Sequence, residues 1–314
     1  MKNRTVPHAI PYQGSKRNLA QDILRYFPRA FHVLYEPFAG SAAITIAAAV
    51  NQLGDRYHIN DLNEPLVELW RAIIETPDLI VSQYEALWIS QLDDPRSFYD
   101  KVRLDFNRTG RPELFLYLLA RCVKGSVRYN SHGEFNQSPD NRRLGMRPET
   151  MRLQICSISH ALKGKTAISS VDYQEVLRST TADDLVYMDP PYQGVCGNRD
   201  TRYLQSVSFS KFVEALVELN ARSIRYIVSY DGRTGDKTHG KSLPEELNLT
   251  LIELFAGRST QATLIGREDV TIESLYLSPS LVEELVHLPM VYRYTRGEQL
   301  CLMERQGEKE TSAP

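Results

Sequence analysis

Short apolar runs alternate with amphipathic stretches over much of the chain. Strands are predicted at residues 32–35, 56–60, 185–188 and 225–229, with further candidates at 249–254 and 272–277, and the run at 185–188 is typical of a buried strand. Apolar residues at helical spacing predict helices at residues 19–27, 43–50, 209–219 and 279–288. Because strands and helices alternate, we expect an α/β fold.

This alternation is interrupted in the middle of the chain. Residues 64–125 and 149–163 follow helical spacing, whereas residues 126–148 are rich in Gly, Ser, Asn, Pro and Arg and predict a loop or hairpin. We therefore expect a discontinuous α/β domain with a mainly helical insert. The predicted limits are 1–65 and 166–280 for the α/β domain, 66–165 for the insert and 281–314 for a C-terminal extension with a polar tail.

Composition narrows the classes of protein that remain. Hydrophobic residues make up 42% of the 314 residues, charged residues make up 24%, and the formal net charge is −2. These values are typical of a soluble folded protein and exclude a wholly basic nucleic-acid binder, but they leave room for a local basic face. The four cysteines lack CxxC spacing and the seven histidines lack HxxxH spacing, which argues against a metal site. The longest uncharged apolar stretch, residues 39–50, is too short to span a membrane, and we expect a cytoplasmic protein.

Two strand ends near the N-terminus carry a candidate nucleotide site. Glu36 and Gly40 follow the first predicted strand, and Asp61 follows the second. Ligands of α/β folds bind outside the carboxyl ends of the strands, where Asp61 could accept hydrogen bonds from ribose hydroxyls. The first turn is apolar and Glu36 repels phosphate, which favours a nucleoside without phosphates. A tight turn with a helix cap is the alternative for this segment alone.

The strand at 185–188 ends in the most informative segment, Asp189-Pro190-Pro191-Tyr192. Two prolines fix a rigid extended backbone and leave the Pro190 carbonyl free to accept a hydrogen bond. Together with the Asp189 carboxylate and the flat ring of Tyr192, this carbonyl suits a planar group bearing an amino group. Two acceptors that hold the amino hydrogens would aim the nitrogen lone pair at an electrophile. The alternative is a Pro-Pro turn with a capping Asp.

Six segments together resemble the motifs of the DNA adenine methylase family, the alpha-group N6-adenine DNA methyltransferases. They are Tyr12-Gln13-Gly14-Ser15-Lys16, Glu36-Pro37-Phe38-Ala39-Gly40, Asn60-Asp61-Leu62-Asn63, Arg128-Tyr129-Asn130-Ser131-His132-Gly133-Glu134-Phe135-Asn136, Val171-Asp172-Tyr173 and Asp189-Pro190-Pro191-Tyr192. The resemblance covers roughly residues 8–280. One departure is Ala42, at a position where the family usually has a second glycine in its cofactor loop.

The resemblance implies a Rossmann-like methyltransferase fold that uses S-adenosylmethionine, releases S-adenosylhomocysteine and needs no metal. It implies a catalytic set and a cofactor-binding set of residues. The catalytic set is Asp189, Pro190, Pro191 and Tyr192, and the cofactor-binding set is Tyr12, Gly14, Lys16, Glu36, Phe38, Gly40, Asp61, Asp172 and Tyr173. The target adenine would flip out of double-stranded DNA into the pocket. The insert at 66–165 would be the target-recognition domain.

A basic segment within the insert is the candidate DNA face. Residues 121–147 contain six basic and two acidic side chains, a local charge of +4. Cations position a duplex through its phosphates, while Asn, Gln and Arg can read base edges. The expected DNA-binding residues are Arg121, Lys124, Arg128, Tyr129, Asn130, Phe135, Asn136, Arg142 and Arg143. A solvated surface loop is the alternative interpretation.

Several functional alternatives stay open at this point. An N4-cytosine methyltransferase more often has Ser where Asp189 stands, and an enzyme acting on RNA or on a protein amide usually has Asn there. A non-enzymatic DNA-binding remnant is the third alternative, raised by Ala42 and opposed by the retained Asp189, Tyr192 and Lys16. The resemblance also suggests a short palindromic target such as GATC, and we expect a monomer of prokaryotic or phage origin. The enzyme would be either an orphan or the partner of a restriction endonuclease.

Overall fold

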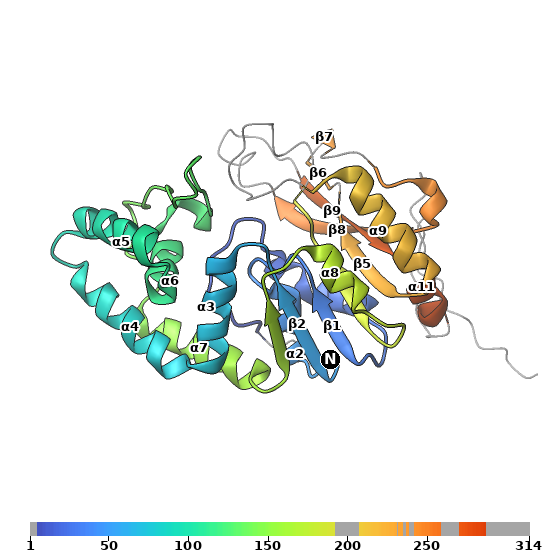
Figure 1. Cartoon of the computed structure of the whole chain (residues 1–314), viewed down its shortest axis with the longest axis horizontal. Coiled ribbons are helices and arrows are strands. Elements are labelled where there is room, and N and C mark those ends of the chain that lie inside the picture. Colours follow the sequence, from blue (N-terminus) through green and yellow to red (C-terminus); the bar gives the residue numbers. More distant parts are fainter. Residues whose placement is uncertain are drawn as a thin grey trace, which may run out of the picture.

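The computed structural model describes residues 5–191, 207–230, 232–234, 237–238, 242–258 and 270–286. Within them, nine strands form one sheet (Figure 1). The strands are β1 (Val33–Glu36), β2 (Arg56–Asn60), β3 (Thr166–Ser169), β4 (Leu185–Met188), β5 (Arg225–Ser229), β6 (Arg233–Thr234), β7 (Lys237–Thr238), β8 (Thr250–Arg258) and β9 (Val270–Leu277). Their order is β3-β2-β1-β4-β5-β9-β6-β7, and β8 pairs with β9 outside this path.

The strand order creates a crevice at the centre of the sheet. Strands β3, β2, β1, β4 and β5 are parallel, and β9 joins them antiparallel. The chain moves outward from β1 to β2 and β3, then returns to place β4 on the other side of β1. The loops after β1 and β4 therefore diverge, and ligands bind at such a switch point, outside the carboxyl ends of the strands. The predicted Rossmann-like α/β class is confirmed.

Alternation along the strands divides the core between the two faces of the sheet. In β4, Leu185 and Tyr187 belong to the apolar cluster that includes helix α2 (Ala43–Val50). Val186 and Met188 point the other way and belong to the cluster formed with helices α8 (Tyr173–Arg178) and α9 (Phe209–Ala221). Successive side chains of a strand face opposite sides, so a strand covered on both faces is apolar throughout. This explains why β4 is recognisable from its sequence.

In the sequence, five helices separate β2 from β3: α3 (Glu64–Glu75), α4 (Pro77–Ser90), α5 (Pro95–Thr109), α6 (Pro112–Arg121) and α7 (Pro148–Leu162). A proline occupies the first turn of each, where its missing N–H costs no hydrogen bond. Figure 1 shows α4, α5 and α6 away from the sheet, with α3 and α7 between them and the sheet. Their apolar faces join the same cluster as α2, so insert and sheet share one core.

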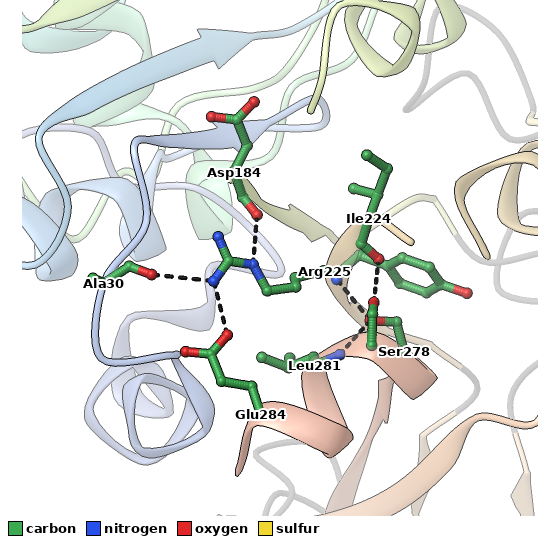
Figure 2. Close-up of polar contacts among 9 residues, drawn as sticks. Ala30, Asp184, Ile224, Arg225, Ser278, Leu281 and Glu284 are labelled. Carbon is green, nitrogen blue, oxygen red and sulfur yellow. Dashed lines mark hydrogen bonds and ion pairs between the residues drawn. The ribbon is translucent and has the colours of Figure 1, made fainter. Parts of the chain in front are cut away.

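The N-terminal and C-terminal segments also pack against the sheet. The first contributes α1 (Ala20–Ile23), flanked by short 3-10 turns at Lys16–Asn18 and Leu24–Tyr26. Helix α11 (Pro279–Val286) follows β9, and Figure 2 shows how β5 holds it. The Arg225 guanidinium donates to the carbonyl oxygens of Asp184 (3.2 Å) and Ala30 (3.1 Å) and pairs with Glu284 (2.8 Å). The helix thus crosses the limit predicted at residue 280 and packs on the α/β domain, whereas residues 287–314 lie outside the described part.

Candidate active site

A cavity of about 290 Å³ opens at the carboxyl ends of β1 and β4, where the strand order predicts a ligand site. Its walls come from the loops after β1, β2, β3 and β4, from an N-terminal loop and from the start of α9. The predicted catalytic and cofactor-binding residues that line it are Tyr12, Gly14, Lys16, Glu36, Phe38, Gly40, Asp61, Asp172, Tyr173, Asp189, Pro190 and Pro191. Tyr192 lies outside the described residues. One pocket thus unites both candidate sites of the sequence.

Asp61 shapes the turn that follows β1. Its two carboxylate oxygens accept hydrogen bonds from the backbone N–H groups of Gly40 (2.9 Å) and Asn63 (2.9 Å). Desolvation raises the pKa of Asp61, although these two hydrogen bonds oppose the shift. Gly40 has a φ of +48°, and a Cβ there would lie 3.0 Å from Cε1 of Tyr12. Glycine therefore lets the turn and the N-terminal loop approach each other across the pocket.

Ala42 has a structural role that its place in the motif did not reveal. It adopts the left-handed conformation, with a φ of 46° and a ψ of 34°, just before α2. Its methyl group is fully buried in the core and does not line the cavity. A glycine at this position would suit the backbone angle, which costs an L-residue roughly 1–2 kcal/mol. The alanine therefore does not narrow the described pocket.

Glu36 is a buried carboxyl group at the base of the pocket. Only 3% of the residue is exposed, and its Oε2 accepts a hydrogen bond from the Thr45 N–H of α2 at 2.9 Å. Burial raises the pKa of Glu36 to about 7, and the charge of nearby Asp189 acts in the same direction. The group thus changes charge near neutral pH, inside a cavity that would receive a charged ligand.

We expect Glu36→Gln to remove a pH-dependent loss of stability. In the wild type the folded state holds the Glu36 proton up to about pH 7, whereas the unfolded chain releases it near pH 4.5. The folded state therefore binds more protons over this interval, and stability falls as pH rises through it. The free energies of unfolding of Glu36→Gln and of the wild type can both be measured in urea. From pH 4.5 to pH 7, their difference should change by about 3 kcal/mol in favour of Glu36→Gln. A constant difference across this range would contradict the burial argument.

The predicted catalytic motif lies beside a charged residue from the N-terminal segment. The Lys16 ammonium lies 3.4 Å from Asp189 Oδ1 and 3.0 Å from Glu273 Oε2. Lys16 is only 8% exposed, so water screens these ion pairs weakly. Lys16 was expected at the cofactor, and the structure places its ammonium beside the catalytic motif. Glu273 is a residue that the sequence did not single out, because β9 carries no motif.

Asn60 is a second residue that the candidate set missed. It is 1% exposed and ends β2. Its amide nitrogen donates to the carbonyl oxygens of Pro37 (3.0 Å) and Val171 (3.0 Å). Its amide oxygen accepts from the Ser169 hydroxyl (2.7 Å) and the Val171 N–H (3.0 Å). Asn60 thus ties together two pocket loops, those that follow β1 and β3. The available signal was its place at the end of a predicted strand, directly before Asp61.

The predicted DNA-binding segment forms a short hairpin in which Tyr129 pairs with Phe135. Phe135 is 1% exposed and packs edge-on against Phe106 and Phe115. Arg121 is 2% exposed and donates to the carbonyl oxygen of Asp140 at 3.0 Å. The structure thus places Arg121 and Phe135 inside the core, where they hold the hairpin in shape, and their predicted contact with DNA stays a prediction.

Other residues of the predicted set lie on the surface. The exposed ones are Lys124, Arg128, Asn136, Arg142 and Arg143, and Asn130 is half-buried. Asn130 organises the hairpin turn, because its side-chain oxygen accepts from the N–H groups of His132 (2.9 Å) and Glu134 (2.9 Å). Arg142 forms an ion pair with Asp140 at 3.2 Å. Lys124, Arg128, Arg142 and Arg143 thus place four basic side chains on the surface of the insert.

Three hydrogen bonds join the insert to segments that line the pocket. The Tyr129 hydroxyl donates to Asn63 Oδ1 at 3.0 Å, and Tyr129 itself lines the cavity. The Gln13 N–H donates to the carbonyl oxygen of Gly125 at 3.0 Å, and the Ser126 hydroxyl donates to Gln13 Oε1 at 2.6 Å. The N-terminal loop, which carries Lys16, therefore rests on the insert.

The described part of the chain contains no helix long and apolar enough to cross a membrane. In the same residues, no three His, Cys, Asp or Glu side chains are grouped so that they could hold a metal ion.

Comparison with known proteins places these features in a family. Residues 12–257 match the family described as D12 class N6 adenine-specific DNA methyltransferase. The chain is 28% identical over 213 residues to the DNA adenine methylase of Serratia marcescens, an alignment that covers 67% of this chain and 74% of that protein. It is 27% identical over 188 residues to the DNA adenine methylase of Haemophilus influenzae, covering 58% and 63%. It is also 27% identical over 200 residues to the type II methyltransferase M.MjaIII of Methanocaldococcus jannaschii, covering 59% and 68%. The aligned part thus spans less than two thirds of the Haemophilus protein.

Proposed function

The chain belongs to the D12 class of N6 adenine-specific DNA methyltransferases, and we propose that its pocket transfers a methyl group from S-adenosylmethionine to N6 of an adenine in double-stranded DNA. The observation that carries the proposal is the single cavity that holds the predicted cofactor loops together with Asp189-Pro190-Pro191. The match confirms the family that the motifs predicted. The enzyme methylates adenine in DNA at specific sites, and the assignment of roles to residues is our proposal.

The described residues fit the chemistry of S-adenosylmethionine. The rings of Phe38 and Tyr173 lie 5.1 Å apart between centroids and offer flat apolar surface to an adenine group. The buried Tyr173 hydroxyl, which has no hydrogen-bond partner within the described residues, would meet a polar ligand atom. The carboxyl groups of Glu36 and Asp61 suit an ammonium group and ribose hydroxyls, respectively. When bound, this cofactor supplies a methyl group already activated on a sulfonium.

Asp189 and Pro190 would prepare the base. The lone pair of an exocyclic amine is delocalised into the ring, so the nitrogen is a poor nucleophile. The Asp189 carboxylate would accept one amino hydrogen and the Pro190 carbonyl the other, which turns the lone pair toward the sulfonium methyl. The bound cofactor would supply the methyl group, and the methylated nitrogen would release its surplus proton to the Asp189 carboxylate, which accepts its hydrogen bond. From its place in the motif, Tyr192 would stack on the flipped adenine.

We expect the exposed basic residues to make DNA binding salt-dependent. Each side chain that neutralises a phosphate adds about −0.9 to the slope of log affinity against log salt concentration. Replacing Arg128 and Arg143 together with alanine should therefore reduce the slope by about two and weaken binding to all sequences alike. Arg25, exposed on the N-terminal segment, provides the matched control variant Arg25→Ala. Fluorescence anisotropy at four salt concentrations measures both, and an unchanged slope would contradict contact with phosphates.

A direct experiment tests the reaction. Purified protein is incubated with plasmid DNA and methyl-labelled S-adenosylmethionine, and the DNA is then digested to nucleosides whose masses are read. We expect labelled N6-methyladenine, and sequencing of the modified positions would give the target site. Labelled N4-methylcytosine would agree with the proposed pocket chemistry but would contradict adenine as the target base. Absence of label in DNA, with the cofactor bound, would overturn the proposed substrate and direct the search to RNA.

A further inference from the structure

Glu273 reaches the catalytic edge because β9 runs against its neighbours. Leu275 of β9 pairs with Ser229, the last residue of β5. Since β9 is antiparallel, Glu273 lies two residues beyond that pair, past the carboxyl end of β5. Asp189 follows the end of the adjacent strand β4. Glu273 belongs to the C-terminal part of the described residues. The topology thus brings its carboxylate to the edge of the sheet that carries the catalytic motif.

Lys16 lies between the two carboxylates and is held closer to Glu273. Its ammonium is 3.0 Å from Glu273 Oε2 and 3.4 Å from Asp189 Oδ1. The three side chains are 8%, 18% and 21% exposed for Lys16, Glu273 and Asp189, respectively. In this weakly screened setting, an ammonium that lost one carboxylate would move fully onto the other. The position of Lys16 therefore depends on Glu273.

We propose that Glu273 is a positioning residue for methyl transfer: it holds Lys16 at a distance from Asp189 that leaves the Asp189 carboxylate able to accept a hydrogen bond from the amino group of the base. The inference rests on the proposed function. Without Glu273, the ammonium would compete with the substrate amino group for the oxygens of Asp189. The loss would appear in the chemical step, because Glu273 is not among the residues that line the pocket.

Two substitutions separate the charge of Glu273 from its shape. Glu273→Gln keeps the length of the side chain and removes the charge, whereas Glu273→Asp keeps the charge and shortens the chain. If charge holds Lys16, kcat should fall by about tenfold in Glu273→Gln and by less in Glu273→Asp, with KM for cofactor and DNA within about threefold. A packing role would reverse this order, because Gln preserves the packing. Glu284→Gln, which breaks the ion pair with Arg225 away from the pocket, is the matched control and should retain wild-type kcat.

A double-mutant cycle with Lys16→Gln tests whether the effect passes through Lys16. At saturating cofactor, Glu273→Gln should lower kcat by less than about twofold once Lys16 has been replaced, because the ion pair is already absent. An equal loss in both backgrounds, or wild-type kcat in Glu273→Gln, would overturn the inference while leaving the proposed function intact. A wild-type protein that transfers no methyl group to DNA would overturn the proposed function itself.

Discussion

Asp189→Ala should lower the rate of methyl transfer by about a thousandfold or more while the affinity for S-adenosylmethionine stays within about threefold of the wild type. Removing a hydrogen-bond partner that acts on the developing charge of a transition state typically costs about two to three orders of magnitude. Here the same group would also orient the nucleophile, which enlarges the loss. Lys16 would keep Glu273 as its partner, so the variant buries no unpaired ammonium and should fold.

Two measurements and one control make this result specific. Single-turnover transfer of labelled methyl to DNA gives the rate, and calorimetric titration with the cofactor gives the affinity. Asp55→Ala removes an exposed carboxylate just before β2, at the opposite edge of the sheet from the pocket. It should leave both quantities unchanged. Turnover of Asp189→Ala near the wild-type rate would rule out the proposed role of the carboxylate.

The residues predicted for the site meet in one pocket because their motifs follow short strands, of which β4 is buried throughout. Strands β2, β4 and β5 match the predicted ranges 56–60, 185–188 and 225–229 residue for residue. The apolar run of β4 in particular identifies a strand that is covered on both faces. Once parallel strands are placed, residues that follow them must meet at one edge, which brings Glu36, Asp61 and Asp189 together.

Contacts between distant segments could not be predicted in the same way. Lys16 and Glu273 are separated by 257 positions, and their meeting requires the antiparallel placement of β9. Strand β3, with the sequence TAIS and a half-exposed pattern, lacks the apolar run that identifies a strand. The sequence likewise shows that basic and aromatic residues are concentrated at 121–147, but it does not show which of them face solvent. Phe135 lies in the core because Phe106 and Phe115 of the neighbouring helices are there to receive it.

Gly125→Ala should destabilise the protein and weaken cofactor binding at the same time. Gly125 has a φ of +59°, and a Cβ there would lie 2.7 Å and 2.8 Å from the carbonyl carbon and oxygen of Pro11. Both atoms belong to backbone, so no side-chain rotation relieves the clash. The left-handed conformation costs roughly 1–2 kcal/mol and the overlap about 1–3 kcal/mol more. The N-terminal loop must then move off the insert, which displaces Tyr12 and Lys16 from the pocket, and we expect cofactor affinity to fall by about tenfold.

Gly110→Ala separates the cost of the left-handed backbone from the cost of the clash with Pro11. Gly110 ends α5 with a φ of +65°, and a Cβ there meets nothing within 4 Å. It should show only the backbone cost of about 1–2 kcal/mol and normal cofactor affinity. Urea unfolding and cofactor titration on both variants give the comparison. If Gly125→Ala matched Gly110→Ala in both measurements, the N-terminal loop would not depend on its contact with the insert. If it lost cofactor affinity as expected, the helical insert would help to build the cofactor pocket, because its backbone supports the loop that carries Lys16 to Asp189.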